Sequence, residues 1–326
     1  MKILVTGATG FIGQYVSYFL QQHGNTILAT GKESEAALAP HGTQWRTMAD
    51  LSHGAVDWTH ALDGVDAVIH LAGMAHRQDK GAAEDWDGYD RVNHLATRSL
   101  AEAIARSTTV TRFIFISSVA VHGTPGSFPL TEKHPLLPDT PYGKSKLDAE
   151  RAIAETLDPA RCKWAIFRPV LVYGPGNPGN MAKLLGFIKR GLPIPIATVP
   201  NRRSFLFVGN LADAMLTYMQ SPVPPSGRAW IIADSEYPST AMMAAALAMA
   251  LGRKPRLWKF PPCFLKGMAH IGDLFLSCGI PSPWNSAIYN KFMGDFFVET
   301  NAIKTELNWA PPHSFQEGIQ LLFKID

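Results

Sequence analysis

The sequence predicts an α/β fold in which helices cover both faces of a doubly wound parallel sheet. Short apolar runs of strand length alternate with amphipathic helical stretches over residues 1–175. The chain begins with an apolar strand, a glycine-rich turn and an amphipathic helix in direct succession, from Lys2 to Leu20. This arrangement is typical of a unit that binds the pyrophosphate of a nucleotide at the start of the helix.

Three glycines form the turn after the first strand. Gly7 is expected to allow a tight turn, Gly10 a close approach of the backbone to phosphates, and Gly13 close packing of the helix on the sheet. Their spacing is G-x-x-G-x-x-G rather than the commoner G-x-G-x-x-G. A glycine-rich turn also occurs without a nucleotide, so the prediction depends on the strand before it and the helix after it.

Composition narrows the function classes. With 326 residues, 46% hydrophobic and 17% charged, the chain has the composition of a soluble globular enzyme of one large or two ordinary domains. A net charge of +3 without a dense basic block gives no reason to expect nucleic acid. The three cysteines show no metal-ligand pattern and predict a reduced, cytoplasmic setting. No signal peptide is expected, because the N-terminal apolar run is short and is used as the first strand. No membrane-spanning segment is expected either, since Ala241–Leu251 is shorter than the roughly 20 residues required.

The second and third predicted strands bear on the cofactor. Thr26–Ala29 is followed by Gly31 and Lys32, where NAD-binding folds place a carboxylate for the ribose hydroxyls. The missing carboxylate and the adjacent cation favour the 2′-phosphate of NADP(H), while NAD(H) remains possible if Lys32 is an ordinary surface lysine. Asp50, followed by Leu51, would bring a carboxylate to the adenine amino group.

A further core strand within Gly64–Gly73 ends in small residues. Ala72 and Gly73 would let a cofactor lie across the end of the strand. The polar residues 76–90, beginning with His76, are either a loop over the substrate or a solvated connection. A helix is predicted over Val92–Arg106.

A serine and a Tyr-x-x-x-Lys pair suggest proton-coupled hydride transfer. Ser118 follows the predicted strand Phe113–Ile116, and Asp139-Thr140-Pro141 starts a helix that places Tyr142 and Lys146 one turn apart. Tyr142 would donate or accept the proton, and Ser118 would orient the reacting oxygen. The Lys146 ammonium, with the positive nicotinamide of an oxidised cofactor, would lower the pKa of Tyr142. An i,i+4 pair alone also occurs without function.

Beyond residue 175 the strand–helix alternation weakens and prolines become frequent. The sequence therefore predicts a dinucleotide-binding domain over residues 1–175 and a smaller mixed substrate-binding region over residues 176–326. The sequence leaves open whether some late segments of the second region join the sheet.

With these motifs in order, the chain resembles the extended short-chain dehydrogenase/reductase family, a Rossmann-fold group of NAD(P)-dependent nucleotide-sugar epimerases, dehydratases and reductases. The resemblance implies Ser118, Tyr142 and Lys146 as catalytic residues. The motifs that carry it are Thr6–Gly13, Asp50-Leu51, His70–Gly73, Asn93, Ser117-Ser118, Tyr142–Lys146, Arg168-Pro169, Asn201–Asp213 and Leu307–Pro312. The cofactor contacts that it implies are Gly7, Gly10, Phe11, Ile12, Gly13, Gly31, Lys32, Asp50, Leu51, Leu71, Ala72, Gly73, Asn93, Tyr142, Lys146 and Pro169.

The resemblance also implies substrate contacts. Arg203 matches an arginine that holds the sugar-nucleotide pyrophosphate, with Arg202 as a second candidate, although both can also be read as surface arginines. The full set is His76, Ser118, Tyr142, Asn180, Arg202 and Arg203.

Two departures from the family pattern are informative. The 4,6-dehydratases carry Asp-Glu directly after the catalytic serine or threonine, whereas this chain has Val119-Ala120, which argues against water elimination. The 4-epimerases have an arginine before the late Gly-Asp, whereas Phe292-Met293 precede Gly294-Asp295 here, with Lys291 close by.

Within the family, Leu71–His76 and Asn201–Ser204 look most like bacterial reductases of UDP-4-keto-6-deoxy-hexosamines, which serve surface polysaccharide synthesis. The resemblance therefore favours net reduction of such a sugar, with NADP(H). A UDP-hexose 4-epimerase with bound NAD is the alternative, and a dinucleotide-sensing regulator or a reductase of a non-nucleotide carbonyl is less favoured. The resemblance further implies a homodimer formed through the helices that contain Asn93 and Tyr142. The role of residues 258–285 stays open.

Overall fold

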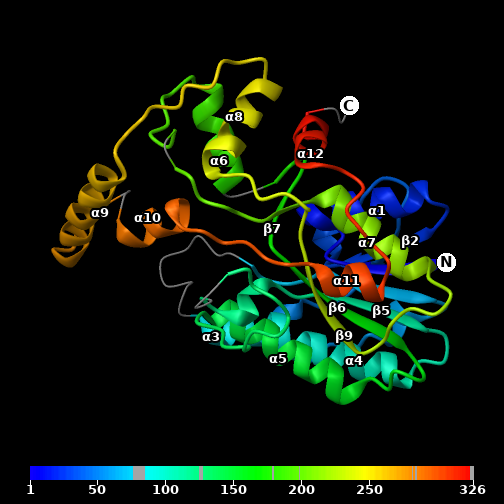
Figure 1. Cartoon of the computed structure of the whole chain (residues 1–326). Coiled ribbons are helices and arrows are strands. Elements are labelled where there is room, and N and C mark those ends of the chain that lie inside the picture. The colour runs from blue at the N-terminus through cyan, green and yellow to red at the C-terminus, as the bar shows by residue number, and fades with distance from the viewer. Residues whose placement is uncertain are drawn as a thin grey trace. The chain divides into compact units, whose positions relative to one another are not determined.

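The computed structural model describes residues 1–75, 85–124, 128–177, 180–197, 199–280, 282 and 285–323, and these form two compact units (Figure 1). The first unit comprises Met1–Val172, Leu206–Ala233 and Glu299–Pro312, and the second comprises Tyr173–Phe205, Asp234–Val298 and His313–Asp326. Two segments from beyond residue 175 belong to the first unit, which is the possibility that the sequence left open.

The first unit contains a parallel sheet, which in the described part of the chain has seven strands in the order β3-β2-β1-β4-β5-β6-β9. The strands are β1 (Lys2–Thr6), β2 (Thr26–Gly31), β3 (Gln44–Thr47), β4 (Ala67–His70), β5 (Arg112–Ile116), β6 (Lys163–Pro169) and β9 (Arg228–Ile232). The strand order reverses between β1 and β4, which is where ligands bind in doubly wound sheets. The predicted fold class is confirmed.

Helices cover both faces of this sheet (Figure 1). One face carries α1 (Phe11–Gln22) and α7 (Val208–Gln220), and the other carries α4 (Ala96–Arg106) and α5 (Pro141–Thr156). The regular part of α4 starts later than predicted, because a π-helical turn, η4, precedes it. Shorter elements are η1 (Glu33–Leu38), η2 (Leu51–His53), α2 (Thr59–Leu62), α3 (Trp86–Tyr89), η4 (Asp90–Leu95), η5 (Val119–His122) and α11 (Asn301–Glu306).

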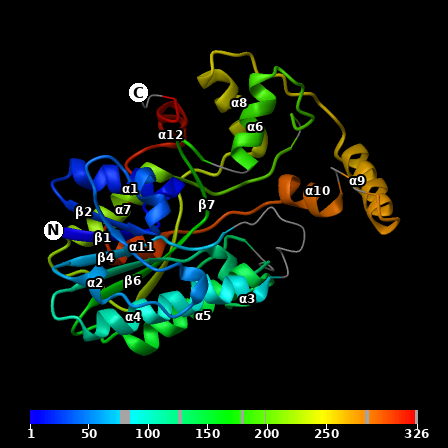
Figure 2. The same cartoon turned by 180° about the vertical axis from the view of Figure 1, so that it is seen from behind.

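The second unit is mostly helical. Its helices are α6 (Asn180–Lys189), α8 (Thr240–Ala250), α9 (Pro262–Ser277), α10 (Ser286–Met293) and α12 (Phe315–Leu321). Helix α8 packs on α6 and α12, while α9 packs on α10 (Figure 2). The strands β7 (Leu171–Tyr173) and β8 (Phe205–Phe207) form a separate two-stranded sheet. Within the described ranges, no helix combines the length and apolarity needed to cross a bilayer.

Two glycines at the junction of β1 and α1, Gly7 and Gly13, have no room for a side chain. Gly7 has a φ of +68°, and a Cβ atom on it would lie 2.7 Å from the backbone nitrogen of Ala72. A Cβ atom on Gly13 would lie 2.1 Å from the carbonyl oxygen of Gly7. Gly13 therefore brings α1 against the turn itself, a closer contact than the helix–sheet packing expected from the sequence. The Gly10 N–H closes the turn by donating to Gly7 O at 3.1 Å.

A buried polar network ties the ends of β1 and β4 to η4. Thr6 Oγ1 lies 2.6 Å from His70 Nδ1 and accepts from the Ala72 N–H, while His70 Nε2 lies 2.9 Å from Thr97 Oγ1. Thr97 donates its single hydroxyl proton to the carbonyl oxygen of Asn93 at 2.6 Å. Nε2 of His70 must therefore carry the hydrogen, and Nδ1 accepts from the Thr6 hydroxyl. Every donor in this chain has an acceptor, which fixes the imidazole in one neutral tautomer.

We expect alanine substitutions at two helical glycines to change stability in opposite directions. Gly13→Ala should lower the free energy of unfolding by at least about 1–3 kcal/mol, because the methyl group would overlap Gly7 O. In α6, Gly186 has no heavy atom within 4 Å of the corresponding Cβ position, so Gly186→Ala should raise the free energy of unfolding by roughly 0.5–1 kcal/mol. Thermal unfolding measures both, and an unchanged melting temperature for Gly13→Ala would contradict the packing argument.

The hydrogen-bond network around His70 also predicts that the free energy of unfolding decreases in acid. Burial, with a smaller contribution from the charge of Lys146, lowers the pKa of His70 to about 3, against about 6.5 in the unfolded chain. Between these values only the unfolded chain binds the proton, so the free energy of unfolding falls by up to about 1.4 kcal/mol per pH unit as the pH decreases from 6.5. His70→Gln should make this slope shallower in urea titrations between pH 6.5 and 4. The exposed His53→Gln is the control, and a variant at position 70 with the full wild-type slope would refute this origin.

Candidate active site

A groove of about 340 Å³ lies at the carboxyl ends of β1, β2 and β4, all within the first unit. It coincides with the point where the strand order reverses, as expected for this class of sheet. The predicted residues that line it are Gly7, Gly10, Gly31, Lys32, Asp50, Leu51, Leu71, Ala72 and Gly73. The sequence did not single out Thr9, Thr30, Glu35, Met48, Ala49, Trp58, Met74 or Val92, which also line it.

The β1 end of the groove fits a dinucleotide pyrophosphate. Gly7 and Gly10 leave the backbone bare there, and side chains at these positions would fill the space. Helix α1 begins at Phe11, with no side-chain cap and no acidic residue in its first turn. Its N-terminal amides and the positive end of the helix dipole are thus available to an anion. The backbone of residues 10–12 is the part of the chain that would hold the phosphates.

Two carboxylates lie at the opposite end of the groove. Lys32 Nζ lies 3.1 Å from Asp50 Oδ2 and 3.8 Å from Glu35 Oε1. Glu35 Oε2 is 2.6 Å from the position that a Cβ atom on Gly31 would take, so Glu35 supplies the carboxylate that position 31 lacks. A backbone hydrogen bond from Ser52, and then the bond from Lys32, lower the pKa of Asp50 to about 2. Lys32 is paired with two anions, and this arrangement does not support a preference for NADP(H).

Ser118 and Tyr142 meet at the carboxyl end of β5. The side chain of Ser118 hydrogen-bonds the Tyr142 hydroxyl and also accepts from the Ala120 N–H at 3.2 Å. Thr140 caps α5 by accepting from the Gly143 N–H, as the predicted helix start implied. Burial raises the pKa of Tyr142, and the hydrogen bond with Ser118 opposes this rise. The pKa of Tyr142 is therefore raised by its protein surroundings, and Tyr142 is a neutral phenol at neutral pH. The lowering expected from Lys146 together with an oxidised nicotinamide stays a prediction.

Lys146 is a buried cation at the wall of the groove. Its ammonium donates to the carbonyl oxygen of Ile116 at 2.9 Å and lies 4.7 Å from the centre of the Phe115 ring. A Cβ atom on Gly73 would lie 3.0 Å from Lys146 Nζ, so Gly73 leaves the ammonium room beside the groove. Burial lowers the pKa of Lys146 to about 8, and the negative charge of Glu150 opposes this shift.

The two serines after β5 have different partners. Ser117 Oγ donates to Glu150 Oε1 at 2.5 Å, and the same carboxylate accepts from Arg168 at 3.0 and 2.6 Å. These three side chains are buried, and Pro169 follows them at the end of β6. Ser117 is therefore occupied in a structural ion-pair cluster, and Ser118 is the serine that contacts Tyr142, which agrees with the choice made from the sequence.

The side chain of Asn93 holds the backbone of Met74, a residue that lines the groove. Its amide accepts from the Met74 N–H at 2.7 Å and donates to Met74 O at 2.9 Å and to Ser145 Oγ at 3.0 Å. The side chain is fully buried. It therefore fixes the segment after β4, which lines the groove, to helix α5, which carries Tyr142 and Lys146.

The predicted arginine contacts belong to the second unit. Arg203 donates to the carbonyl oxygen of Gly294 at 3.1 Å, and burial lowers its pKa while Asp295 opposes the shift. The guanidinium of Arg202 lies 3.9 Å from the centre of the Phe297 ring, and the backbone N–H of Arg202 donates to the Asp295 carboxylate. The sequence pair Gly294-Asp295 is thus bound by these arginines within one unit. Asn180 opens α6, and its side chain and all of His76 lie outside the described part of the chain.

Comparisons with known proteins agree with this geometry. The family model described as "NAD dependent epimerase/dehydratase family" matches residues 3–233. The UDP-glucose 4-epimerase of Vibrio cholerae is 31% identical over 323 residues, covering 98% of this chain and 93% of that protein. The dTDP-6-deoxy-L-talose 4-dehydrogenase (NAD(P)(+)) of Kitasatospora kifunensis is 30% identical over 190 residues, 57% of this chain and 56% of that protein.

A solved structure shares the fold. The UDP-glucuronic acid 4-epimerase from Bacillus cereus, in complex with NAD, superposes with a TM-score of 0.73 at 20% identity, covering 98% of this chain and 97% of that one. Family match, full-length relative and strand order point the same way, and the chain belongs to the NAD-dependent epimerase/dehydratase family of extended short-chain dehydrogenases/reductases.

Proposed function

We propose that this protein is an NAD(P)-dependent oxidoreductase that acts at C4 of a UDP-hexose, with net reduction of a 4-keto sugar. The observation that carries the proposal is the hydrogen bond between Ser118 and Tyr142, together with Lys146, which lies one turn after Tyr142 on α5 and has its buried ammonium beside the groove residue Gly73. Membership of a family of enzymes that act on sugar nucleotides supports this choice.

In the proposed reduction, Tyr142 would act as the general acid. Its raised pKa keeps the phenol protonated at neutral pH, which is the form that donates a proton to a carbonyl oxygen as that oxygen is reduced. Ser118 would hydrogen-bond the same oxygen and orient it. A reduced nicotinamide cofactor, when bound, would supply the hydride. The positive charge of Lys146 would stabilise the phenolate that forms as Tyr142 gives up its proton, and the ammonium would also bind the ribose hydroxyls of the cofactor.

The substrate proposal uses the second unit. Arg203, with Arg202 beside it, would hold the pyrophosphate of the UDP-sugar, for which the fork of donors in a guanidinium is suited. Dehydration is disfavoured, because Val119 and Ala120 follow Ser118 on η5 and neither can transfer a proton.

For the cofactor, the carboxylates of Glu35 and Asp50 support NAD(H) over NADP(H), since they would accept hydrogen bonds from the adenosine ribose and would repel a 2′-phosphate. The same proposal includes a homodimer formed through η4–α4 and α5, and a cytoplasmic site of action.

A UDP-hexose 4-epimerase is the second candidate. It is favoured by the full-length similarity to the Vibrio cholerae enzyme. It would use Ser118, Tyr142 and Lys146 in the same positions, with Tyr142 alternating between base and acid and the cofactor retained between turnovers.

Activity assays test the proposal. With UDP-4-keto sugars and reduced nicotinamide cofactor, we expect stoichiometric loss of the reduced-cofactor absorbance. Tyr142→Phe should lower kcat by 10²–10⁴-fold, the range of one general acid. The control is Tyr218→Phe, which removes a buried hydroxyl that has no hydrogen-bond partner among the described residues, and it should retain activity. Turnover of UDP-hexoses without added cofactor would favour the epimerase, and full activity of Tyr142→Phe would refute both.

Cofactor binding tests the role of Glu35. The wild-type protein should bind NAD⁺ more tightly than NADP⁺ in isothermal titration calorimetry. Glu35→Gln should weaken NAD⁺ binding by about tenfold, or about 1.4 kcal/mol, and reduce the discrimination against NADP⁺. Glu33→Gln is the matched control, because Glu33 lies on the same short helix but bonds the Thr47 hydroxyl. Tighter binding of NADP⁺ by the wild type would overturn this assignment.

A further inference from the structure

Helix α9 exposes a continuous apolar face. Phe264, Met268, Ile271 and Phe275 recur at i, i+4, i+7 and i+11 and are 44% to 55% exposed. This spacing places all four side chains on one side of the helix. Leu274, which is 62% exposed, extends the same face. Contiguous apolar surface of this kind marks an interaction site in a folded protein.

This face is not the one that packs within the unit. Leu265, Ala269 and Gly272 form a separate buried stripe on α9, and the helix packs on α10 (Figure 2). Lys266 and His270 lie between the two apolar stripes and are exposed. Helix α9 thus has one apolar face for its own unit and a second that, among the described residues, no other part of the chain covers.

The exposed face continues into the preceding segment through aromatic rings. The rings of Trp258 and Phe260 are stacked with centroids 6.4 Å apart, and those of Phe260 and Phe264 at 5.6 Å. Trp258 is 55% exposed. Its backbone is fixed, since Trp258 N–H donates to Ile194 O at 2.9 Å and Trp258 O accepts from the Ala197 N–H at 3.1 Å. The rings of Trp258, Phe260 and Phe264 therefore form an aromatic ridge, which leads from an ordered strand-like segment to the apolar face of α9.

Exposed basic side chains belong to the same chain segment as the aromatic ridge. Residues 253–280 contain five Lys or Arg and one Asp, an excess of positive charge greater than that of the whole chain, which is +3. Arg253, Lys254, Arg256, Lys259 and Lys266 are all exposed. Exposed aromatic and aliphatic side chains interleaved with cations are typical of proteins that bind anionic membrane surfaces.

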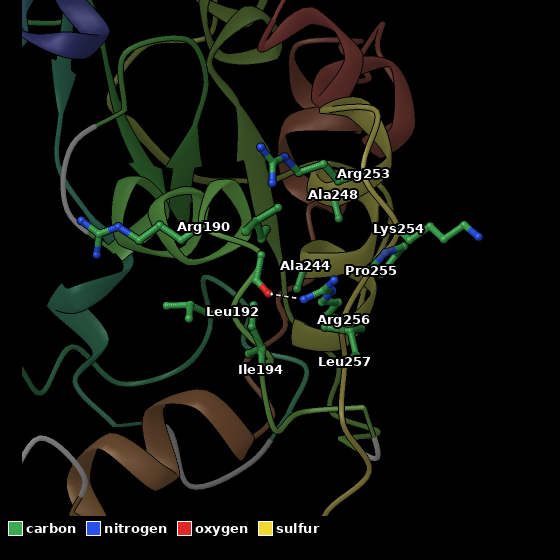
Figure 3. A pocket seen from close by; sticks show the side chains of 12 residues that line it. Arg190, Leu192, Ile194, Ala244, Ala248, Arg253, Lys254, Pro255, Arg256 and Leu257 are labelled. Atoms are coloured by element: carbon green, nitrogen blue, oxygen red, sulfur yellow. Dashed lines mark hydrogen bonds between the residues drawn. The ribbon is translucent and has the colours of Figure 1, made fainter.

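The arrangement of the basic side chains indicates whether they would bind one anion or an extended anionic surface. Arg190, Arg253, Lys254 and Arg256 line a pocket of about 340 Å³ (Figure 3). Figure 3 shows Arg190 and Lys254 pointing to opposite sides, while Arg256 donates to Gly191 O at 3.1 Å. The charges do not converge as they would around one phosphate. They are spread out, which suits several lipid head groups.

We propose that residues 253–280 dock this protein on an anionic lipid bilayer, with the aromatic ridge and the apolar face of α9 in the boundary between head groups and acyl chains. Helix α9 has 16 residues, so it lies on the membrane and does not cross it. A second copy is a poorer partner, because pairing these faces would bring two basic segments together. The proposal is independent of the reaction at Tyr142.

Vesicle flotation of the full-length protein tests this docking. We expect flotation with phosphatidylcholine vesicles that contain 30% phosphatidylglycerol, at least tenfold more than with phosphatidylcholine alone, and loss of most of it in 0.5 M salt. Ile271→Ser with Phe275→Ser should abolish flotation. The matched control, Tyr18→Ser with Val223→Ser, removes two apolar side chains that are 60% and 81% exposed elsewhere and should float like the wild type.

Charge variants complete the test. Lys254→Gln with Lys259→Gln should lower flotation at least fivefold, and the control Arg106→Gln with Lys133→Gln should not. Absence of flotation of the wild type on anionic vesicles would overturn the proposal. So would equal flotation of the α9 variant, or a change of oligomeric state in that variant with unchanged flotation, which would assign the face to a second copy. Reductase activity on a soluble UDP-sugar, measured in parallel, reports separately on the proposed function.

Discussion

The close approach of three backbone segments around Gly7 is the constraint on which the site depends. At this point the end of β1, the start of α1 and the segment after β4 are so near one another that a single methyl group would overlap a neighbouring backbone atom. Interiors packed at this density do not relax easily around an added atom. Gly7 and Gly10 leave bare peptide groups at the sheet edge, and bare peptide groups are what a phosphate needs. Close packing and anion binding are therefore consequences of the same glycines.

The reactive part of the site combines buried charge with complete hydrogen bonding. Lys146 and Glu150 lie one turn apart on α5, and both are removed from water. Glu150 is satisfied by Arg168 and Ser117, so its charge acts on Lys146 at a distance and counteracts part of the effect of burial. The hydrogen-bond network around His70 is neutral and adds no charge at the ends of β1 and β4. Lys146 is thus a buried cation whose field is offset in part by Glu150.

The sequence was sufficient for the fold class, because strand length, helix period and the glycine turn are local signals. The choice of Ser118 depended on the family resemblance, and the structure places the Ser118 side chain in a hydrogen bond with Tyr142. The sequence missed Glu35, which lies on a short helix after β2 and reaches back to Gly31; no local pattern links those two positions. It left open which late segments join the sheet, since Arg228–Ile232 does so only through its pairing with β6. The expectation for the pKa of Tyr142 considered charge alone, because desolvation requires knowledge of burial.

The late position of β9 in the chain affects how the protein is made. During synthesis, β6 is completed long before residues 228–232 leave the ribosome, and until then its outer edge has unpaired peptide groups. Exposed strand edges of this kind pair readily with other chains. The nascent protein therefore passes through a stage in which a nearly complete sheet is open on one side, and a chaperone that covers this edge would protect it from aggregation.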